Sequence, residues 1–353
     1  RIIADKTPNM HPNINAYHLN PCIGNLLGHK VPMTGQILVT GGTPVKTADQ
    51  SGMVYTQPPE VDAFQRWQKG EFLDIERLYS KKWRRALNAI PYERVLSDLA
   101  LIDIDPSSCK TLEEAKFIAE SVSNASGYSV DRMKLVFSVL NIPNHFHKKI
   151  FDRWGLNGCP SLKSFAPYAS FIFTVEIFFY TAALSNLISK EKVSNKVDIS
   201  YLFYLPFCMI FVSSDKIHRR CTPLFLRDDQ MFVWGEDLKA DLKRIDEYYD
   251  KVPESEKEKG LIAIAHRPPI DEDLLVASIY DRFLPKWREW PANFYPRKDD
   301  NLANHINRFT DAKPIEPHKV DFDLSEPDAL VLQRRTHIKK GKWYQLPKNI
   351  LDK

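Results

Sequence analysis

The sequence predicts an α/β protein in which short buried strands alternate with helices. The clearest strand is Cys208–Val212, a continuous apolar run that follows a helical segment stopped by Pro206. A second strand, Met231–Trp234, precedes an amphipathic helix over Glu236–Tyr249. At 353 residues the chain is long enough for one elaborated domain with appended segments.

Composition excludes several classes of protein. Hydrophobic residues make up 43% of the chain and aromatic residues 12%, which excludes wholesale disorder. The 49 basic and 45 acidic residues leave a net charge of +4, so bulk charge does not indicate nucleic-acid binding. The five cysteines form no Cys-x-x-Cys pair, which argues against a disulfide framework and a zinc site. We therefore expect a reducing, cytoplasmic compartment. No charged-then-apolar segment opens the given sequence, so we expect no signal peptide within it.

Residues 1–97 are predicted to be a proline-rich region with amphipathic helices. Prolines and glycines divide its first part into short pieces such as Gln36–Thr40, for which a short strand or a hairpin is predicted, and Gly41–Pro44 is predicted as a turn. From Pro58 to Ile90, apolar residues recur at helical spacing, which predicts two helices or one helix broken near Gly70. The basic side chains of this segment are expected to be solvated; they are Lys81, Lys82, Arg84 and Arg85.

A core domain is predicted over residues 98–250, beginning with a strand over Asp98–Pro106. Alternation along this strand would place Asp103 and Asp105 on one face. The sequence Thr111-Leu112-Glu113-Glu114 then has the capping-box pattern that begins a helix.

A further helix is expected around Val130–Leu140, and the histidines that follow it are expected at the surface. His145 and His147 are two positions apart, a spacing that does not match zinc ligands.

Phe165–Ile188 is the most hydrophobic stretch, and we interpret it as a buried central helix beginning at Pro167. Its length would also satisfy a membrane span. However, the mean hydropathy of the chain is −0.36, polar residues interrupt the stretch, and Glu176 lies near its middle. A buried carboxylate needs a cation, a metal or a shared proton, so an ion pair with an arginine and a shared metal are both open.

Two aspartates flank the next apolar segment. Asp198 is expected at the N-cap or in the first turn of a helix, and Ser213-Ser214-Asp215 follows the predicted strand. Open α/β sheets bind ligands at that edge. The order of acid, helix, hydrophobic strand and Ser-x-Asp resembles the second half of a PIN-like nuclease domain. The resemblance covers the middle third of the chain and implies a three-layer core with a parallel sheet.

The resemblance also implies a metal-dependent nuclease, in which clustered carboxylates bind Mg²⁺ or Mn²⁺ and the metal activates water. Asp198 and Asp215 would correspond to the two late aspartates, and Glu176 or the pair Asp103 and Asp105 would complete the cluster, with Asp5 as a weaker competitor for the role of that pair. The basic run after Asp215 would act on the phosphate, with catalytic and backbone-binding candidates Lys216, His218, Arg219 and Arg220. A solvated turn and a structural N-cap are the alternative interpretations of these residues.

Residues 251–353 are predicted to be a charged linker followed by a basic C-terminal extension. Lys339, Lys340 and Trp343 interleave positive charge with an aromatic ring, a pattern that can follow a single-stranded nucleic acid. A solvated tail is the alternative. The expected partner is therefore RNA or DNA, single-stranded rather than duplex, and a protein partner or a second copy of the chain stays open.

Two other classes of function stay open. A non-catalytic scaffold would keep the same core, with the acids serving as caps and ion pairs. A membrane-associated protein would use residues 165–188 and 199–212 as a hydrophobic hairpin; we expect no membrane association, because Glu176 makes burial cheaper than a span.

Overall fold

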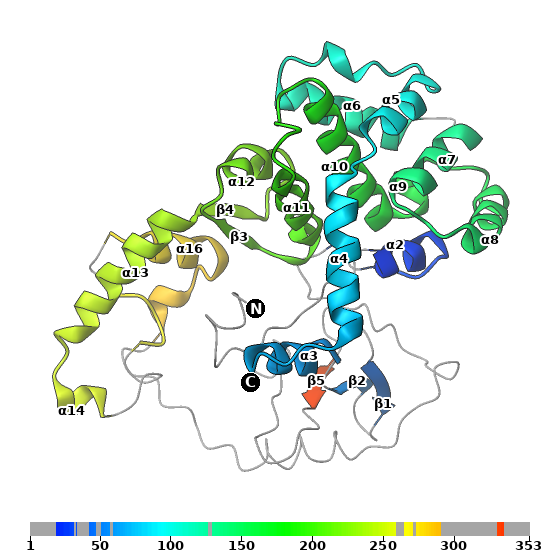
Figure 1. Ribbon diagram of the computed structural model, residues 1–353. Coiled ribbons are helices and arrows are strands. Elements are labelled where there is room, and N and C mark those ends of the chain that lie inside the picture. The colour runs from blue at the N-terminus through cyan, green and yellow to red at the C-terminus, as the bar shows by residue number, and fades with distance from the viewer. Residues whose placement is uncertain are drawn as a thin grey trace. The chain divides into compact units, whose positions relative to one another are not determined.

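The computed structural model describes residues 19–31, 33, 42–46, 51–56, 59–125, 129–258, 265–270, 273–290 and 330–334 (Figure 1). Within these residues the protein is mostly helical and contains a small parallel two-stranded sheet, which confirms a mixed α/β class. The chain divides into two units, Arg1–Cys208 with His305–Lys353, and Met209–Asn304. The division lies inside the range 98–250 that the sequence predicts as one core.

The first unit is built mainly from helices. They are α2 (Leu19–Leu26), α3 (Pro59–Gln68), α4 (Asp74–Asn88), α5 (Tyr92–Ala100), α6 (Leu112–Asn124), α7 (Val130–Val139), α8 (Asn144–Leu156), α9 (Leu162–Phe165), α10 (Pro167–Leu184) and α11 (Ser194–Ser200), with the 3-10 turns η1 (Pro106–Ser108) and η2 (Tyr201–Phe207). The expected break near Gly70 is confirmed, because this glycine has a φ of +78° between α3 and α4.

Helix α10 is the centre of this unit (Figure 1). It begins with Pro167 and contacts α2, α5, α6, α7, α9 and α11. The Ser123 and Thr174 hydroxyls, 2.6 Å apart, join α6 to α10 inside the core. Among the described residues, α10 is the one helix with the length and apolarity of a membrane span, and most of it is buried within the protein. The prediction of a buried central helix is therefore confirmed.

A side chain from α2 caps the start of α10. The residue before the helix, Ala166, offers no capping side chain. Instead, Asn25 Oδ1 accepts hydrogen bonds from the backbone N–H of Tyr168 (3.0 Å) and Ala169 (3.3 Å), while its Nδ2 donates to the His29 carbonyl (3.0 Å). Asn25 is buried, so this remote cap satisfies backbone donors that water does not reach.

A three-stranded sheet joins the two parts of the first unit. Strand β1 (Gly42–Lys46) pairs antiparallel with β2 (Ser51–Thr56), and β2 pairs in parallel with β5 (Leu330–Arg334). The turn predicted at Gly41–Pro44 is wrong from Gly42 onward, because the ladder to β2 continues through that residue. The strand predicted at Gln36–Thr40 lies outside the described residues.

The strand predicted at Asp98–Pro106 is wrong. Helix α5 extends to Ala100, because Val95 and Leu99, four positions apart, are both buried on one helical face. Leu101 is 76% exposed, so the alternation that suggests a strand has no buried side. The helix is closed by an Ile104 N–H to Leu99 carbonyl hydrogen bond of 3.1 Å, with Asp103 in the left-handed region at φ 58°.

The helices after this turn agree with the sequence. Thr111 accepts the backbone N–H of Glu114 at 3.1 Å, as the capping-box pattern predicts, and α7 occupies the range expected for it. His145 is exposed as expected, whereas His147 is half-buried and packs on Phe137.

The second unit contains a parallel strand pair followed by helices. Its elements are β3 (Ile210–Ser213), α12 (Lys216–Cys221), η3 (Thr222–Leu224), β4 (Met231–Trp234), α13 (Gly235–Asp250), α14 (Glu254–Lys257), α16 (Leu275–Phe283) and η4 (Trp287–Glu289). Strands β3 and β4 pair from Ile210 opposite Met231 to Ser213 opposite Trp234. Trp287 is fully buried with Leu274 and Ala277. Both predicted strands and the helix after β4 are confirmed.

Candidate functional site

The candidate site is the edge at which β3 and β4 end. Because the strands are parallel and Ser213 pairs with Trp234, the residues that follow both strands emerge on the same side of the sheet. They are Ser214 and Asp215 after β3, and Gly235 after β4. This is the edge at which open α/β sheets bind ligands.

The two strand ends are packed closely at Gly235. A Cβ atom at this position would lie 3.1 Å from the Ser214 backbone nitrogen and 3.2 Å from the Ser213 carbonyl carbon, and it would overlap the Ser214 hydroxyl. Glycine is therefore needed for close backbone approach, and the edge has little freedom to open.

A hydrogen-bond network fixes Asp215 in this edge. Asp215 Oδ1 accepts the Ile217 N–H at 2.8 Å, which makes Asp215 the N-cap of α12. Its own N–H donates to the Ser213 hydroxyl at 3.0 Å, and that hydroxyl lies 2.7 Å from His218 Nδ1. His218 is buried, with its ring edge-on to Phe211. The network holds the carboxylate of Asp215 in one orientation.

The helix that Asp215 begins is basic. The side chains of Lys216, Arg219 and Arg220 are exposed on α12, the helix that Asp215 begins. The Arg219 guanidinium lies 5.0 Å above the ring of Trp234, the last residue of β4. The strand ends and the helix that follows β3 thus carry one carboxylate, three exposed cations and an indole ring within one unit.

The other predicted metal ligands belong to the first unit. Glu176 lies in α10 and forms an ion pair with Lys196 of α11. Asp103 and Asp105 are exposed in the turn after α5. In the described part of the chain, no three side chains of His, Cys, Asp and Glu are grouped so that they could hold a metal ion.

Asp198 occupies a different position in its helix from the one that the sequence predicts. The prediction of an N-cap or first-turn position is wrong, because α11 begins at Ser194 and Asp198 lies in its second turn. The polar residues before Asp198 form the first turn of α11, and two of them make contacts outside this helix. Asn195 donates to the Ser189 carbonyl at 3.0 Å, and Lys196 binds Glu176.

The chain matches no protein-family model, and neither a curated protein nor a solved structure is significantly similar to it.

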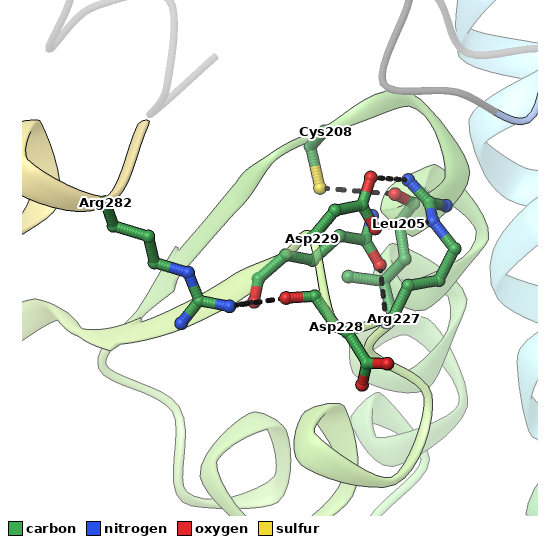
Figure 2. A network of polar contacts seen from close by, with 7 residues as sticks. Leu205, Cys208, Arg227, Asp228, Asp229 and Arg282 are labelled. Carbon is green, nitrogen blue, oxygen red and sulfur yellow. Dashed lines mark hydrogen bonds and ion pairs between the residues drawn. The ribbon is translucent and has the colours of Figure 1, made fainter. Parts of the chain in front are cut away.

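The opposite end of β4 carries a second polar network (Figure 2). Arg227 binds Asp229 through Nε at 2.9 Å and through Nη2 at 3.2 Å, and this contact holds the pKa of Asp229 below its usual range. Arg282 of α16 donates to the Asp228 carbonyl at 2.7 Å and the Gln230 carbonyl at 2.8 Å. These bonds tie α16 to the loop that enters β4, so this network supports the fold rather than the carboxyl edge.

Some features of the edge could be predicted from sequence and others could not. The apolar run before Ser213 predicts that Asp215 ends a strand. The roles of Trp234 and Gly235 depend on the pairing of β3 with β4, for which the sequence carries no local signal. The predicted nucleic-acid contacts Lys339, Lys340 and Trp343 lie outside the described residues.

Proposed function

We propose that the protein is a metal-dependent nuclease with a PIN-like core, and that it holds a phosphodiester at the carboxyl edge of β3 and β4. The observation that supports this proposal is the position of Asp215 at the end of a parallel strand, beside the cations of α12. A carboxylate next to exposed lysine and arginine side chains suits a substrate that is itself anionic.

The donor atoms at this edge fit a hard cation in part. Asp215 Oδ1 caps α12, and within the described residues Oδ2 has no hydrogen-bond or ion-pair partner. Mg²⁺ and Mn²⁺ prefer such oxygen ligands. The ion pair with Lys196 argues against Glu176 as a metal ligand. A bound Mg²⁺ or Mn²⁺ would supply an activated water and would neutralise charge on the phosphate.

The residues of the edge then have separate tasks. Lys216, Arg219 and Arg220 attract and orient the phosphate backbone, because their charges are exposed. We assign His218 to positioning rather than to phosphate contact, because it is buried and bonded to Ser213. Through Ser213 it fixes the backbone of Asp215.

A second candidate is a serine hydrolase. The Ser213 hydroxyl oxygen lies 2.7 Å from His218 Nδ1, which is the hydrogen-bond distance expected between a nucleophile and its general base. The Ser213 hydroxyl also accepts the Asp215 N–H, which favours a structural role for it. The two candidates differ in the group that reacts: the hydrolase needs Ser213 as its nucleophile and no metal, whereas the nuclease needs Asp215 together with a metal.

The test is metal-dependent cleavage of end-labelled single-stranded RNA and DNA by the wild type, Asp215→Asn, Ser213→Ala and the control Asp246→Asn. Asn caps a helix as well as Asp does, so Asp215→Asn should keep its melting temperature while losing at least about tenfold in Mn²⁺-dependent rate. Asp246 is exposed on α13, so its variant should match the wild type.

Full activity of Asp215→Asn, or no cleavage of either strand by the wild type with Mg²⁺ or Mn²⁺, would refute the nuclease proposal. Hydrolysis of an ester substrate that needs Ser213 but no metal would establish the second candidate instead. Asp198→Asn, assayed beside these variants, tests the sequence-based expectation that activity requires Asp198.

A further inference from the structure

A hollow of about 480 Å³ lies in the first unit, between α5, α7 and α8. Its walls come from one residue of α5, three of α7, the link between α7 and α8, and three of α8. The hollow has the size of a site for one small molecule, because such pockets measure roughly 300–1,000 Å³. It belongs to a different unit from the β3–β4 edge.

Two cations line this hollow. The Arg94 and Lys134 side chains are 63% and 64% exposed, respectively. Each has an acidic neighbour on its own helix, Asp98 at 3.9 Å from Arg94 and Asp131 at 3.0 Å from Lys134. Asp98 also accepts the Ser138 hydroxyl at 3.0 Å. Exposed pairs of this kind stabilise a helix very little, so both cations can turn toward an anion at small cost.

An aromatic platform forms another part of the wall. The His147 imidazole stacks on the Phe137 ring, with centroids 4.2 Å apart and 22° between the planes. Its Nε2 bonds to the Ile142 carbonyl at 2.7 Å, and Phe151 packs edge-on to Phe137 at 5.0 Å. Contacts on two sides fix the imidazole in one orientation. A fixed planar ring in a hollow is suited to stacking with a heterocyclic base.

Amide side chains complete the lining. Asn141 follows α7 with φ 52°, and Asn144 is the first residue of α8. An amide offers two N–H donors and a carbonyl acceptor on one group, which matches the alternating donors and acceptors at the edge of a base. Helix α8 has Pro143 at its N-cap, no side-chain cap and no acid in its first turn, so the positive end of its dipole adds to the two cations.

We propose that this hollow binds a nucleoside 5′-phosphate. The base would lie against His147 and meet the amides of Asn141 and Asn144, and the phosphate monoester would be held by Arg94 and Lys134. Such a group is present both in a free mononucleotide and at the 5′ end of a nucleic-acid strand. The inference does not depend on the nuclease proposal, because none of its residues belongs to the second unit.

Isothermal titration calorimetry of the full chain with the four ribonucleoside 5′-monophosphates, the matching nucleosides and inorganic phosphate tests the proposal. At least one monophosphate should bind with a Kd below about 1 mM, and its nucleoside should bind at least about tenfold more weakly. The double variant Arg94→Gln/Lys134→Gln should raise the Kd of the monophosphate by at least about tenfold. Lys148→Gln, an exposed neighbour outside the lining, is the matched control and should change the Kd by less than about twofold.

Competition by 5′-phosphorylated and 5′-hydroxyl single strands separates the two sources. If only the phosphorylated strand displaces the mononucleotide, the ligand of the hollow is the 5′ end of a strand. If neither strand displaces it, the ligand is a free nucleotide. Equal displacement by both strands would overturn the requirement for a phosphate monoester. Absence of binding by every monophosphate, or equal affinity of wild type and the double variant, would overturn the proposal. Asp215→Asn should bind the nucleotide as the wild type does, so this result is independent of nuclease activity.

Discussion

Lys196 of α11 binds the Glu176 carboxylate in the middle of α10, twenty positions earlier in the chain. The side chains are only 16% and 11% exposed, and the ammonium also lies 4.7 Å from the Phe179 ring centroid and 4.8 Å from that of Tyr180. The pair therefore neutralises a charge that the apolar core would not tolerate alone.

Glu176→Gln should lower the free energy of unfolding by about 3 kcal/mol, because it leaves the Lys196 charge buried without its partner. Urea denaturation measures this change. Glu176→Gln/Lys196→Met should recover part of the loss, and Glu120→Gln, which breaks a more exposed pair with Lys116, should cost about 0.5 kcal/mol or less. Equal stability of wild type and Glu176→Gln would contradict the prediction.

The carboxylate of Glu76 should make the stability of the α3–α4 link depend on pH. Arg66 donates to it at 2.7 and 3.3 Å, Trp67 Nε1 at 2.9 Å and the Leu73 N–H at 2.9 Å. These bonds, led by that of Arg66, lower the pKa of Glu76 from about 4.5 to about 2. Because the folded pKa is depressed, the stabilisation is complete above about pH 4.5 and disappears as the pH falls toward 2.

Melting temperatures of wild type and Glu76→Gln, measured between about pH 7 and pH 2, should differ by a constant amount at the upper end and converge below about pH 4.5. Repeating the comparison in an Arg66→Met background should weaken this pH dependence, because the main cause of the lowered pKa is gone. A difference that stays constant over the whole range would contradict the prediction.

Asn25 should contribute more to stability than a helix cap that is local in sequence. Asn25→Ala removes the acceptor for the N–H groups of Tyr168 and Ala169 and leaves them buried, which should cost about 1–3 kcal/mol. Thermal unfolding measures the loss. Ser129→Ala, which removes an exposed local cap of α7, is the comparison and should cost about 1 kcal/mol or less. A smaller loss for Asn25→Ala than for Ser129→Ala would be inconsistent with the remote cap.

Gly235→Ala should destabilise the second unit by about 1–3 kcal/mol, because the added methyl group meets the backbone of Ser213 and Ser214. Gly155→Ala is the matched control. It lies within α8, with nothing near the position of an added Cβ, so it should be neutral or stabilising by up to about 1 kcal/mol. Chemical denaturation of both variants distinguishes them. A Gly235→Ala protein as stable as the wild type would show that the edge can open.

The sequence predicts the elements whose signals are local. Pro167 and the apolar run after it identify α10, Thr111 with Glu114 identifies the start of α6, and the apolar residues before Ser213 identify β3. Each signal lies within a few residues of the feature that it determines. Hydrophobic periodicity and capping are properties of short segments, so they are visible without the fold.

The failures share a different cause. The apolar residues between Val95 and Ile104 satisfy helical and strand spacing alike, and the choice depends on which of them the rest of the chain buries. Asp198 lies within a helix whose Lys196 forms an ion pair with Glu176. Because Glu176 belongs to another element, the residues around Asp198 give no sign of this contact. For the candidate site, Asp215 at the end of β3 could be predicted, but the contact of Gly235 with Ser214 could not, because it depends on strand pairing.

The pairing of β2 with β5 has a consequence for synthesis on the ribosome. Strand β5 leaves the ribosome after the whole of the second unit, on the order of tens of seconds after β2 at typical elongation rates. During that interval one side of β2 lacks its parallel neighbour, and a nascent chain with an open strand edge is vulnerable to pairing with another chain. When translation stalls within the second unit, the nascent chain would therefore expose the unpaired edge of β2. Chaperones should bind most to nascent chains that are arrested at this stage.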